Sequence, residues 1–154
     1  MRESLSALSG LSRESNAIAF YLAEANVQRL PALIEYLTRI EYLSIAIIEN
    51  QGFTAQSYTS VVALNKRLGE LALQLKKNYE QFNRVAGKSG KNYSTQYQAF
   101  SEAIASYQLV IQTELIDPDE IALPLSRAKQ LAQQQNDMAT ALWTLSHKQL
   151  GELL

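Results

Sequence analysis

Residues 93–111 read YSTQYQAFSEAIASYQLVI, and their large apolar and aromatic side chains recur at intervals of 4, 3, 4, 3 and 4 residues. This spacing is typical of a helix that buries one face against other helices, whereas a half-buried strand would alternate every second residue. The stretch therefore predicts a helix that continues to Ile116. The positions of its predicted seam are Tyr93, Tyr97, Phe100, Ile104, Tyr107 and Ile111.

The segment before it carries the same signal. Residues 3–50 predict a first helix, with Pro31 inside it. Because proline lacks a backbone donor and disfavours helical geometry at the preceding residue, we expect a kink or a break between Val27 and Leu30. Gly52 suits the position that terminates this helix. Its predicted seam is Leu8, Leu11, Ile18, Leu22 and Ala25 before the proline, and Leu33, Leu37, Ile40, Ser44 and Ile47 after it.

Two further helices are predicted on either side of residues 93–116. One begins near Thr54 to Ser57 and ends at a loop in residues 87–92. The other is expected to start at Asp117, since Pro118 suits a first helical position, with a restart after Pro124 as the alternative. The predicted seam of the earlier helix is Val61, Leu64, Leu68, Leu71, Leu75, Asn78 and Phe82. That of the later one is Leu125, Ala128, Leu131, Gln135, Met138, Leu142 and Leu145.

Four long helices joined by short links predict an all-α fold, an elongated up-down-up-down four-helix bundle. Residues 1–154 are expected to form a single domain, because this length suits one hydrophobic core. A complete break at Pro31 would give five helices instead of four, and the sequence leaves that choice open.

Composition excludes much chemistry. The chain has no cysteine and one histidine, His147, so disulfides, thiolate metal sites and cysteine catalysis are excluded. We expect no metal, no cofactor and no enzymatic activity. The net charge of −1 gives no general attraction to nucleic acid, and nucleic-acid binding is not predicted. No run of about 18 apolar residues occurs, so a membrane link is expected only through flanking segments absent from this chain.

One group of polar side chains is a candidate ligand site. Counted from the predicted turns, five residues fall within a band of about 15 Å at 1.5 Å per helical residue. Arginine offers a fork for carboxylate or phosphate, and tyrosine a flat hydrogen-bonding wall, so a small anionic or amphipathic ligand is predicted. Alternatively, one tyrosine belongs to the core and Arg39 pairs with Glu35 one turn away. The five residues are Tyr36, Arg39, Tyr58, Tyr107 and Arg127.

The whole-chain pattern resembles the helical-bundle sensor domains of bacterial transmembrane receptors, such as chemoreceptors and sensor kinases. Residues 5–15, LSALSGLSRES, look like the entry helix of such domains, and residues 136–143, NDMATALW, look like the exit helix. The resemblance implies a non-catalytic, periplasmic module that senses a ligand or a partner. It also implies a homodimer formed through the first and last helices.

A second hypothesis stays open beside the sensor. The chain could be a soluble cytoplasmic adaptor, chaperone or assembly subunit that binds a protein partner through a helical groove. Polar residues within the predicted seams favour this alternative, because such residues can fix register or oligomeric state. They are Ser44, Asn78 and Gln135.

Overall fold

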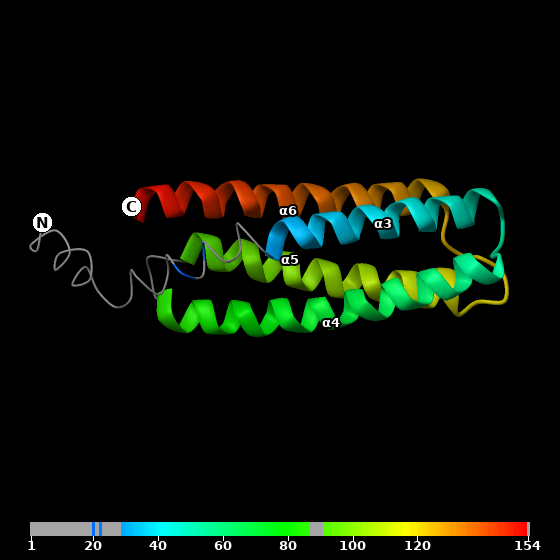
Figure 1. Ribbon diagram of the computed structural model, residues 1–154, viewed down its shortest axis with the longest axis horizontal. Helices are drawn as coiled ribbons and strands as arrows, with labels where there is room; N and C mark the ends of the chain where they lie inside the picture. The colour runs from blue at the N-terminus through cyan, green and yellow to red at the C-terminus, as the bar shows by residue number, and fades with distance from the viewer. Residues whose placement is uncertain (1–19, 21, 23–28, 87–90, 154) are drawn as a thin grey trace, which may run out of the picture.

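Four long helices form the body of the protein. The computed structural model describes residues 20, 22, 29–86 and 91–153. Over these residues the fold is an all-α four-helix bundle, elongated and up-down-up-down, as predicted (Figure 1). The helices are α3 (Leu30–Glu49), α4 (Ala55–Ala86), α5 (Lys91–Val110) and α6 (Leu125–Leu153). A π-helical segment, η2 (Ile111–Ile116), extends α5.

Helix α3 starts at the predicted proline and ends at the predicted turn. Pro31 lies in its first turn, where a missing N–H leaves no helical hydrogen bond unmade. Of the expected break between Val27 and Leu30, residues 27 and 28 lie outside those described, and Arg29 and Leu30 have helical backbone. The seam positions Leu8, Leu11, Ile18 and Ala25 also lie outside the described residues. Leu22 is described, and it is fully buried.

The α3–α4 turn corrects one detail of the prediction. The residue with left-handed backbone is Gln51, with φ of 57°, and not Gly52. The Gln51 N–H bonds to the Ile48 carbonyl at 3.0 Å, and the Gly52 N–H bonds to the Ile47 carbonyl at 3.2 Å. This pattern closes the end of α3 by satisfying its last carbonyl groups. A side chain is therefore held in a conformation that glycine adopts at lower cost.

A reciprocal pair of hydrogen bonds starts α4. The Ser57 N–H donates to the Thr54 hydroxyl at 3.0 Å, and the Thr54 N–H donates to the Ser57 hydroxyl at 2.8 Å. This arrangement satisfies two of the donors that every helix leaves unpaired at its N-terminus. It fixes the start of α4 where the sequence predicted it.

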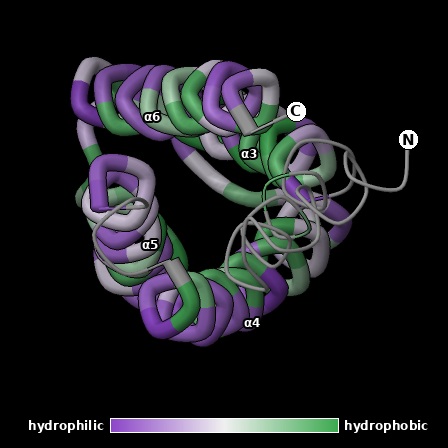
Figure 2. Tube along the Cα trace, turned by 90° about the vertical axis from the view of Figure 1, so that its left-hand side faces the viewer, coloured by the Kyte–Doolittle hydropathy of each residue, from purple (hydrophilic) through white to green (hydrophobic). Residues whose placement is uncertain are grey.

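The core lies along four buried stripes, each with heptad spacing. Viewed along the bundle, α3 and α6 lie together on one side, and α4 and α5 lie on the other (Figure 2). The closest packing is within these two pairs, α4 with α5 and α3 with α6. The α5 seam is buried as predicted, and so is the α3 seam after the proline. The buried residues of α3 are Leu30, Leu33, Leu37, Ile40, Ser44 and Ile47.

The stripes of α4 and α6 agree with the predicted seams in part and differ at the remaining positions. The predicted positions that are buried are Val61, Leu68, Leu75, Phe82, Ala128, Gln135 and Leu142. In both, smaller side chains than expected occupy buried positions and allow close helix approach. Leu64, Leu71 and Asn78 lie only half-buried on a flank of α4, and Leu131 and Met138 do so on α6. The buried stripe of α4 is Val61, Asn65, Leu68, Ala72, Leu75 and Phe82. That of α6 is Ala128, Ala132, Gln135, Ala139, Leu142 and Ser146.

The connection between α5 and α6 corrects a second prediction. Residues 117–124 are not helical, so Asp117 does not start the last helix; α6 begins at Leu125, after Pro124. The Asp117 N–H bonds five residues back to the Gln112 carbonyl at 2.9 Å and completes the wide turn of η2. The carboxylate of Asp117 accepts a hydrogen bond from the Gln112 amide at 2.7 Å. Asp117 therefore ends a helix, and Pro118 cannot continue it.

A buried amide ties α4 to this irregular end of α5. Asn65 is fully buried, and its Nδ2 donates to the Gln108 carbonyl at 3.2 Å and to the Gln112 Oε1 at 3.1 Å. A wide turn disturbs the regular i to i−4 ladder, so carbonyl groups beside it are open to side-chain donors. Asn65 fixes the register of α4 against α5 at this point.

Candidate ligand-binding crevice between α3 and α4

A crevice of about 270 Å³ separates the N-terminal half of α3 from the middle of α4. Its deepest residues are apolar, since Leu33 and Leu75 are almost completely buried. Arg67 and Gln74 are exposed at its rim, and Tyr36 is half-buried. The lining residues are Arg29, Ala32, Leu33 and Tyr36 from α3 and its N-cap, and Arg67, Leu71, Gln74, Leu75 and Asn78 from α4.

The crevice follows from the two faces of α4. The small buried side chains of α4 face α5. Helix α4 packs more closely against α5 than against α3. The flank toward α3 carries Leu71 and Asn78, seven residues apart, with Arg67 and Gln74 on the same side. These larger and polar side chains do not interdigitate with Leu33 and Tyr36 as core residues would. The side chains on this flank of α4 thus form a shallow crevice with an apolar floor and a polar rim.

The rim has a defined charge pattern. An Arg67 nitrogen lies 3.0 Å from a carboxylate oxygen of Glu70, in an exposed pair. Burial raises the pKa of the Tyr36 hydroxyl, while the positive charges of Arg67 and Arg39 act to lower it and Glu70 acts to raise it. With its pKa above the ordinary value, Tyr36 keeps its proton at neutral pH. It can therefore donate a hydrogen bond into the crevice.

Asn78 brings an unsatisfied donor to this site. Its Nδ2 is buried and has no hydrogen-bond acceptor among the residues that the structure describes. An unpaired buried donor costs roughly 1–3 kcal/mol, which is why such groups are rare in native proteins. Beside an open crevice, the amide is available to an acceptor brought by a ligand.

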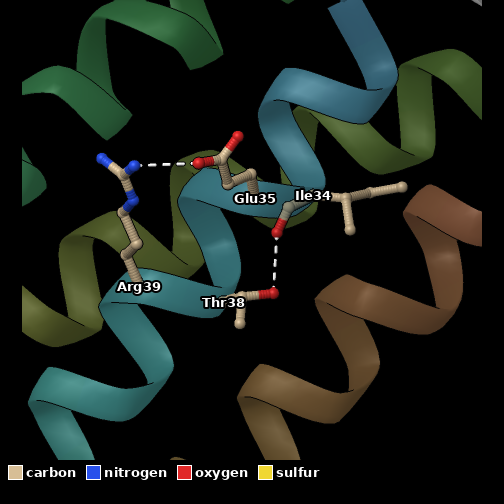
Figure 3. A network of polar contacts seen from close by, with 4 residues as sticks. All are labelled: Ile34, Glu35, Thr38 and Arg39. Atoms are coloured by element: carbon tan, nitrogen blue, oxygen red, sulfur yellow. Dashed lines mark hydrogen bonds and ion pairs between the residues drawn. The ribbon is translucent and has the colours of Figure 1, made fainter.

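The predicted five-residue site is only partly represented here. Tyr36 lines the crevice, and the other four residues do not. Arg39 is on α3 but bonds to Glu35 at 2.8 Å, the alternative foreseen from the sequence. Figure 3 shows this pair along α3, beside the bond from the Thr38 hydroxyl to the Ile34 carbonyl.

The remaining three predicted residues are dispersed. Tyr58 is exposed and packs edge-on against Phe53, with ring centroids 5.3 Å apart. Tyr107 is a core residue, and burial together with the charge of Glu41 raises the pKa of its hydroxyl. Arg127 forms an ion pair with Glu114 beyond the end of α5. That the five residues form a common site stays a prediction. Of the five, Tyr36 is the residue that lines the crevice.

Sequence reasoning did not select Arg67 as a site residue, and it placed Asn78 in the seam. A usable signal was present, because Arg67, Leu71, Gln74 and Asn78 follow one another at intervals of 4, 3 and 4 residues. Such a stripe, part charged and part apolar, marks a helix flank that is neither core nor fully solvated. The lone histidine, His147, is exposed on α6 and stacks on Trp143, with ring centroids 5.8 Å apart.

Comparisons of the chain with protein families, with curated proteins and with solved structures find no match. Within the described ranges, no helix combines the length and the apolar character needed to cross a bilayer. The same ranges hold no cluster of three or more His, Asp or Glu side chains placed to bind a metal ion.

Proposed function

We propose that this chain is a non-catalytic, ligand-sensing module that binds a small amphipathic anion in the α3–α4 crevice. The observation that carries the proposal is one crevice with an apolar floor, lined by Arg67 and, eleven residues further along α4, by Asn78 with its unpaired, buried Nδ2. The wider setting belongs to the same proposal: an extracytoplasmic domain of a bacterial signal-transduction receptor.

A short carboxylate with an apolar tail fits these groups best. Its tail would lie on the apolar floor beside the half-buried Leu71, and the removal of the tail itself from water would supply non-directional affinity. Its carboxylate would accept a hydrogen bond from the Tyr36 hydroxyl and would compete with Glu70 for Arg67. A second acceptor on the ligand would bind Asn78, which lies eleven residues, or about 16 Å, further along α4. Charge-assisted bonds from arginine are the strongest available here. The volume of about 270 Å³ favours a small molecule over a large one.

Binding of such a ligand would change the distance between α3 and α4, and this change would be the signal. The ligand would bridge α3 and α4, which pack less closely than α4 and α5. A ligand shifts a conformational equilibrium only by its difference in affinity for the two states. A crevice between loosely packed helices supplies that difference, because binding favours the state in which α3 and α4 are held together.

The test is a binding series of straight-chain monocarboxylates, with alcohols of equal length as neutral controls. We expect carboxylates to raise the melting temperature and to bind in isothermal titration, and alcohols to bind at least tenfold more weakly. Arg67→Gln should weaken binding by about tenfold or more, in line with roughly 1.5–3 kcal/mol for a hydrogen bond to a charged group. Arg39→Gln is the matched control, because Arg39 lies outside the crevice. Absence of any carboxylate binding to the wild-type chain would overturn the proposal.

The receptor setting has its own test. A transmembrane receptor requires apolar spans of about 20 residues in the gene, directly before and after this segment. Their presence would support the sensor, and their absence would favour the cytoplasmic adaptor predicted as the alternative.

A further inference from the structure

The other flank of α4 carries a second hollow, a groove of about 660 Å³ along the outer surface of α4 and α5. Small residues line it, including Gly69, Ala72 and Ala105, so another backbone can approach closely. Beside them Leu73 is 64% exposed, and Leu109, next along α5 from the lining residue Gln108, is 58% exposed. Exposed leucines next to a small-residue groove are unusual on a surface that faces only water.

The charges along this flank of α4 have a self-complementary order. Reading along the helix, Lys66, Glu70, Leu73, Lys76 and Glu80 follow at intervals of 4, 3, 3 and 4 residues. The spacing is symmetric about Leu73, while the signs of charge are reversed about it. Exposed Lys77 also lies on this flank, and its counterpart at the same distance before Leu73 is the uncharged Gly69. Lys66, Lys76 and Glu80 take part in no ion pair within the described chain. Within the described residues, the ion pair that Glu70 forms is with Arg67, one turn away.

From this order we propose that a second copy of the chain docks on the α4–α5 groove, with the two α4 helices antiparallel. A two-fold axis crossing α4 at Leu73 places each residue 73+n opposite residue 73−n of the partner. Lys76 then faces Glu70 of the partner subunit, and Lys66 faces Glu80 of the partner subunit. The two Leu73 side chains meet at the axis, over the small residues of the groove. A parallel arrangement would set like charges against each other.

This interface differs from the one that the receptor resemblance implies, which uses the first and last helices. It is also distinct from the α3–α4 crevice, whose residues lie on the opposite flank of α4. Glu70 links the two sites through its ion pair with Arg67, so Lys76→Glu and Leu73→Cys are the variants that test the dimer without altering the crevice.

The first experiment is sedimentation equilibrium of the full chain over a wide concentration range. We expect a monomer–dimer equilibrium that weakens toward about 1 M salt, where the Debye length falls to about 3 Å. Lys76→Glu and Glu70→Lys, made singly, should each weaken association by about tenfold, because like charges then face each other twice per dimer. The double variant E70K/K76E restores opposite charges across the axis and should regain wild-type association.

The second experiment uses the absence of cysteine in the chain. Leu73→Cys places one thiol on each side of the axis, and mild oxidation should give a disulfide-linked dimer. Lys66→Cys is the matched control on the same flank. Its two copies lie seven residues from the axis, about 20 Å from each other at 1.5 Å per residue, too far for a disulfide.

The outcomes separate cleanly. A dimer that cross-links through Leu73→Cys, and is rescued by the double charge swap, supports the proposal. A chain that stays monomeric at every concentration overturns it. So does a dimer that is indifferent to both charge reversals and forms no disulfide through Leu73→Cys, because that dimer uses another face.

Discussion

The two interfaces of α4 show what close and loose packing do in one molecule. Toward α5, Phe82 contacts Tyr93 edge-on with ring centroids 4.9 Å apart, and Tyr93 contacts Tyr97 at 5.6 Å. Toward α3, the same helix leaves a crevice and an unpaired amide at Asn78. One helix thus stabilises the fold with one side and keeps a hollow on another. The α4–α5 side holds the fold together, and the α3–α4 side is where a ligand could add contacts.

Removing an aromatic ring from the close interface should have the largest effect on stability. Phe82→Ala deletes a side chain that is 1% exposed, and should lower the free energy of unfolding by about 3–5 kcal/mol. Leu71→Ala, on the loose side, removes a half-buried side chain and should cost about 1–2 kcal/mol. Urea denaturation of both variants measures the difference. Equal losses would show that the two interfaces are packed alike.

The amide at the irregular end of α5 should rank second. Asn65→Ala removes the bonds to the Gln108 carbonyl and to Gln112, at a cost of about 2 kcal/mol. Hydrogen exchange in residues 111–116 should accelerate, because the wide turn loses its tie to α4. Thr95→Ala is the control, since its exposed hydroxyl bonds only to Lys91 in its own helix. Unchanged exchange in η2 would argue that Asn65 does not hold it.

On the loose side, one substitution should stabilise the protein. Asn78→Leu replaces the buried unpaired donor with an apolar side chain, and should raise the free energy of unfolding by about 1 kcal/mol. The same variant should bind more weakly only those carboxylates that carry a second acceptor for Asn78, because it lacks the donor. Gln74→Leu, at the exposed rim, is the control and should stay within about 0.5 kcal/mol of wild type. A destabilised Asn78→Leu variant would mean that the amide is satisfied in solution.

The smallest effects are expected from the arginines. The side chains of Arg39 and Glu35 are 63% and 67% exposed, so Arg39→Gln should change stability by no more than about 0.5 kcal/mol. Arg67→Gln breaks a pair whose side chains are 51% and 53% exposed, and should have a similarly small effect. Thermal denaturation should therefore not distinguish the two variants, whereas carboxylate titration should. A large loss of stability in Arg67→Gln alone would assign it a structural role.

Much of the fold could be predicted because heptad spacing marks the buried face of a helix whichever other helix packs against it. The α3 and α5 stripes consist of large apolar side chains with few competitors, so the pattern selected them correctly. On α4 two heptad patterns coexist, one through Leu64 and Leu71 and one through Asn65 and Ala72. Sequence reasoning chose the larger side chains, whereas close approach of α4 to α5 requires the smaller ones.

The irregular turn and the site were harder to predict, for related physical reasons. Asp117 followed by proline is a sound signal for a helix start, yet here the same residues end a helix, because η2 uses the Asp117 N–H. Helix-length counting placed five residues at similar heights but could not assign them to faces. In the structure, Arg39 pairs with Glu35 and Arg127 pairs with Glu114, whereas Tyr107 lies in the core.

The wide turn of η2 is also a place where the chain can tolerate the insertion or deletion of one residue. An α-helix rotates by about 100° per residue, so one inserted residue would swing every later side chain off its face. A turn that closes over five residues absorbs such an insertion locally, and both Leu115 and Ile116, at the C-terminal end of η2, are buried. A one-residue deletion between 111 and 116 would leave the stripe from Tyr93 to Tyr107 in register with α4. The same deletion inside that stripe would turn half of it toward solvent, so η2 marks the place in α5 where descendants of this sequence can gain or lose a residue and still fold.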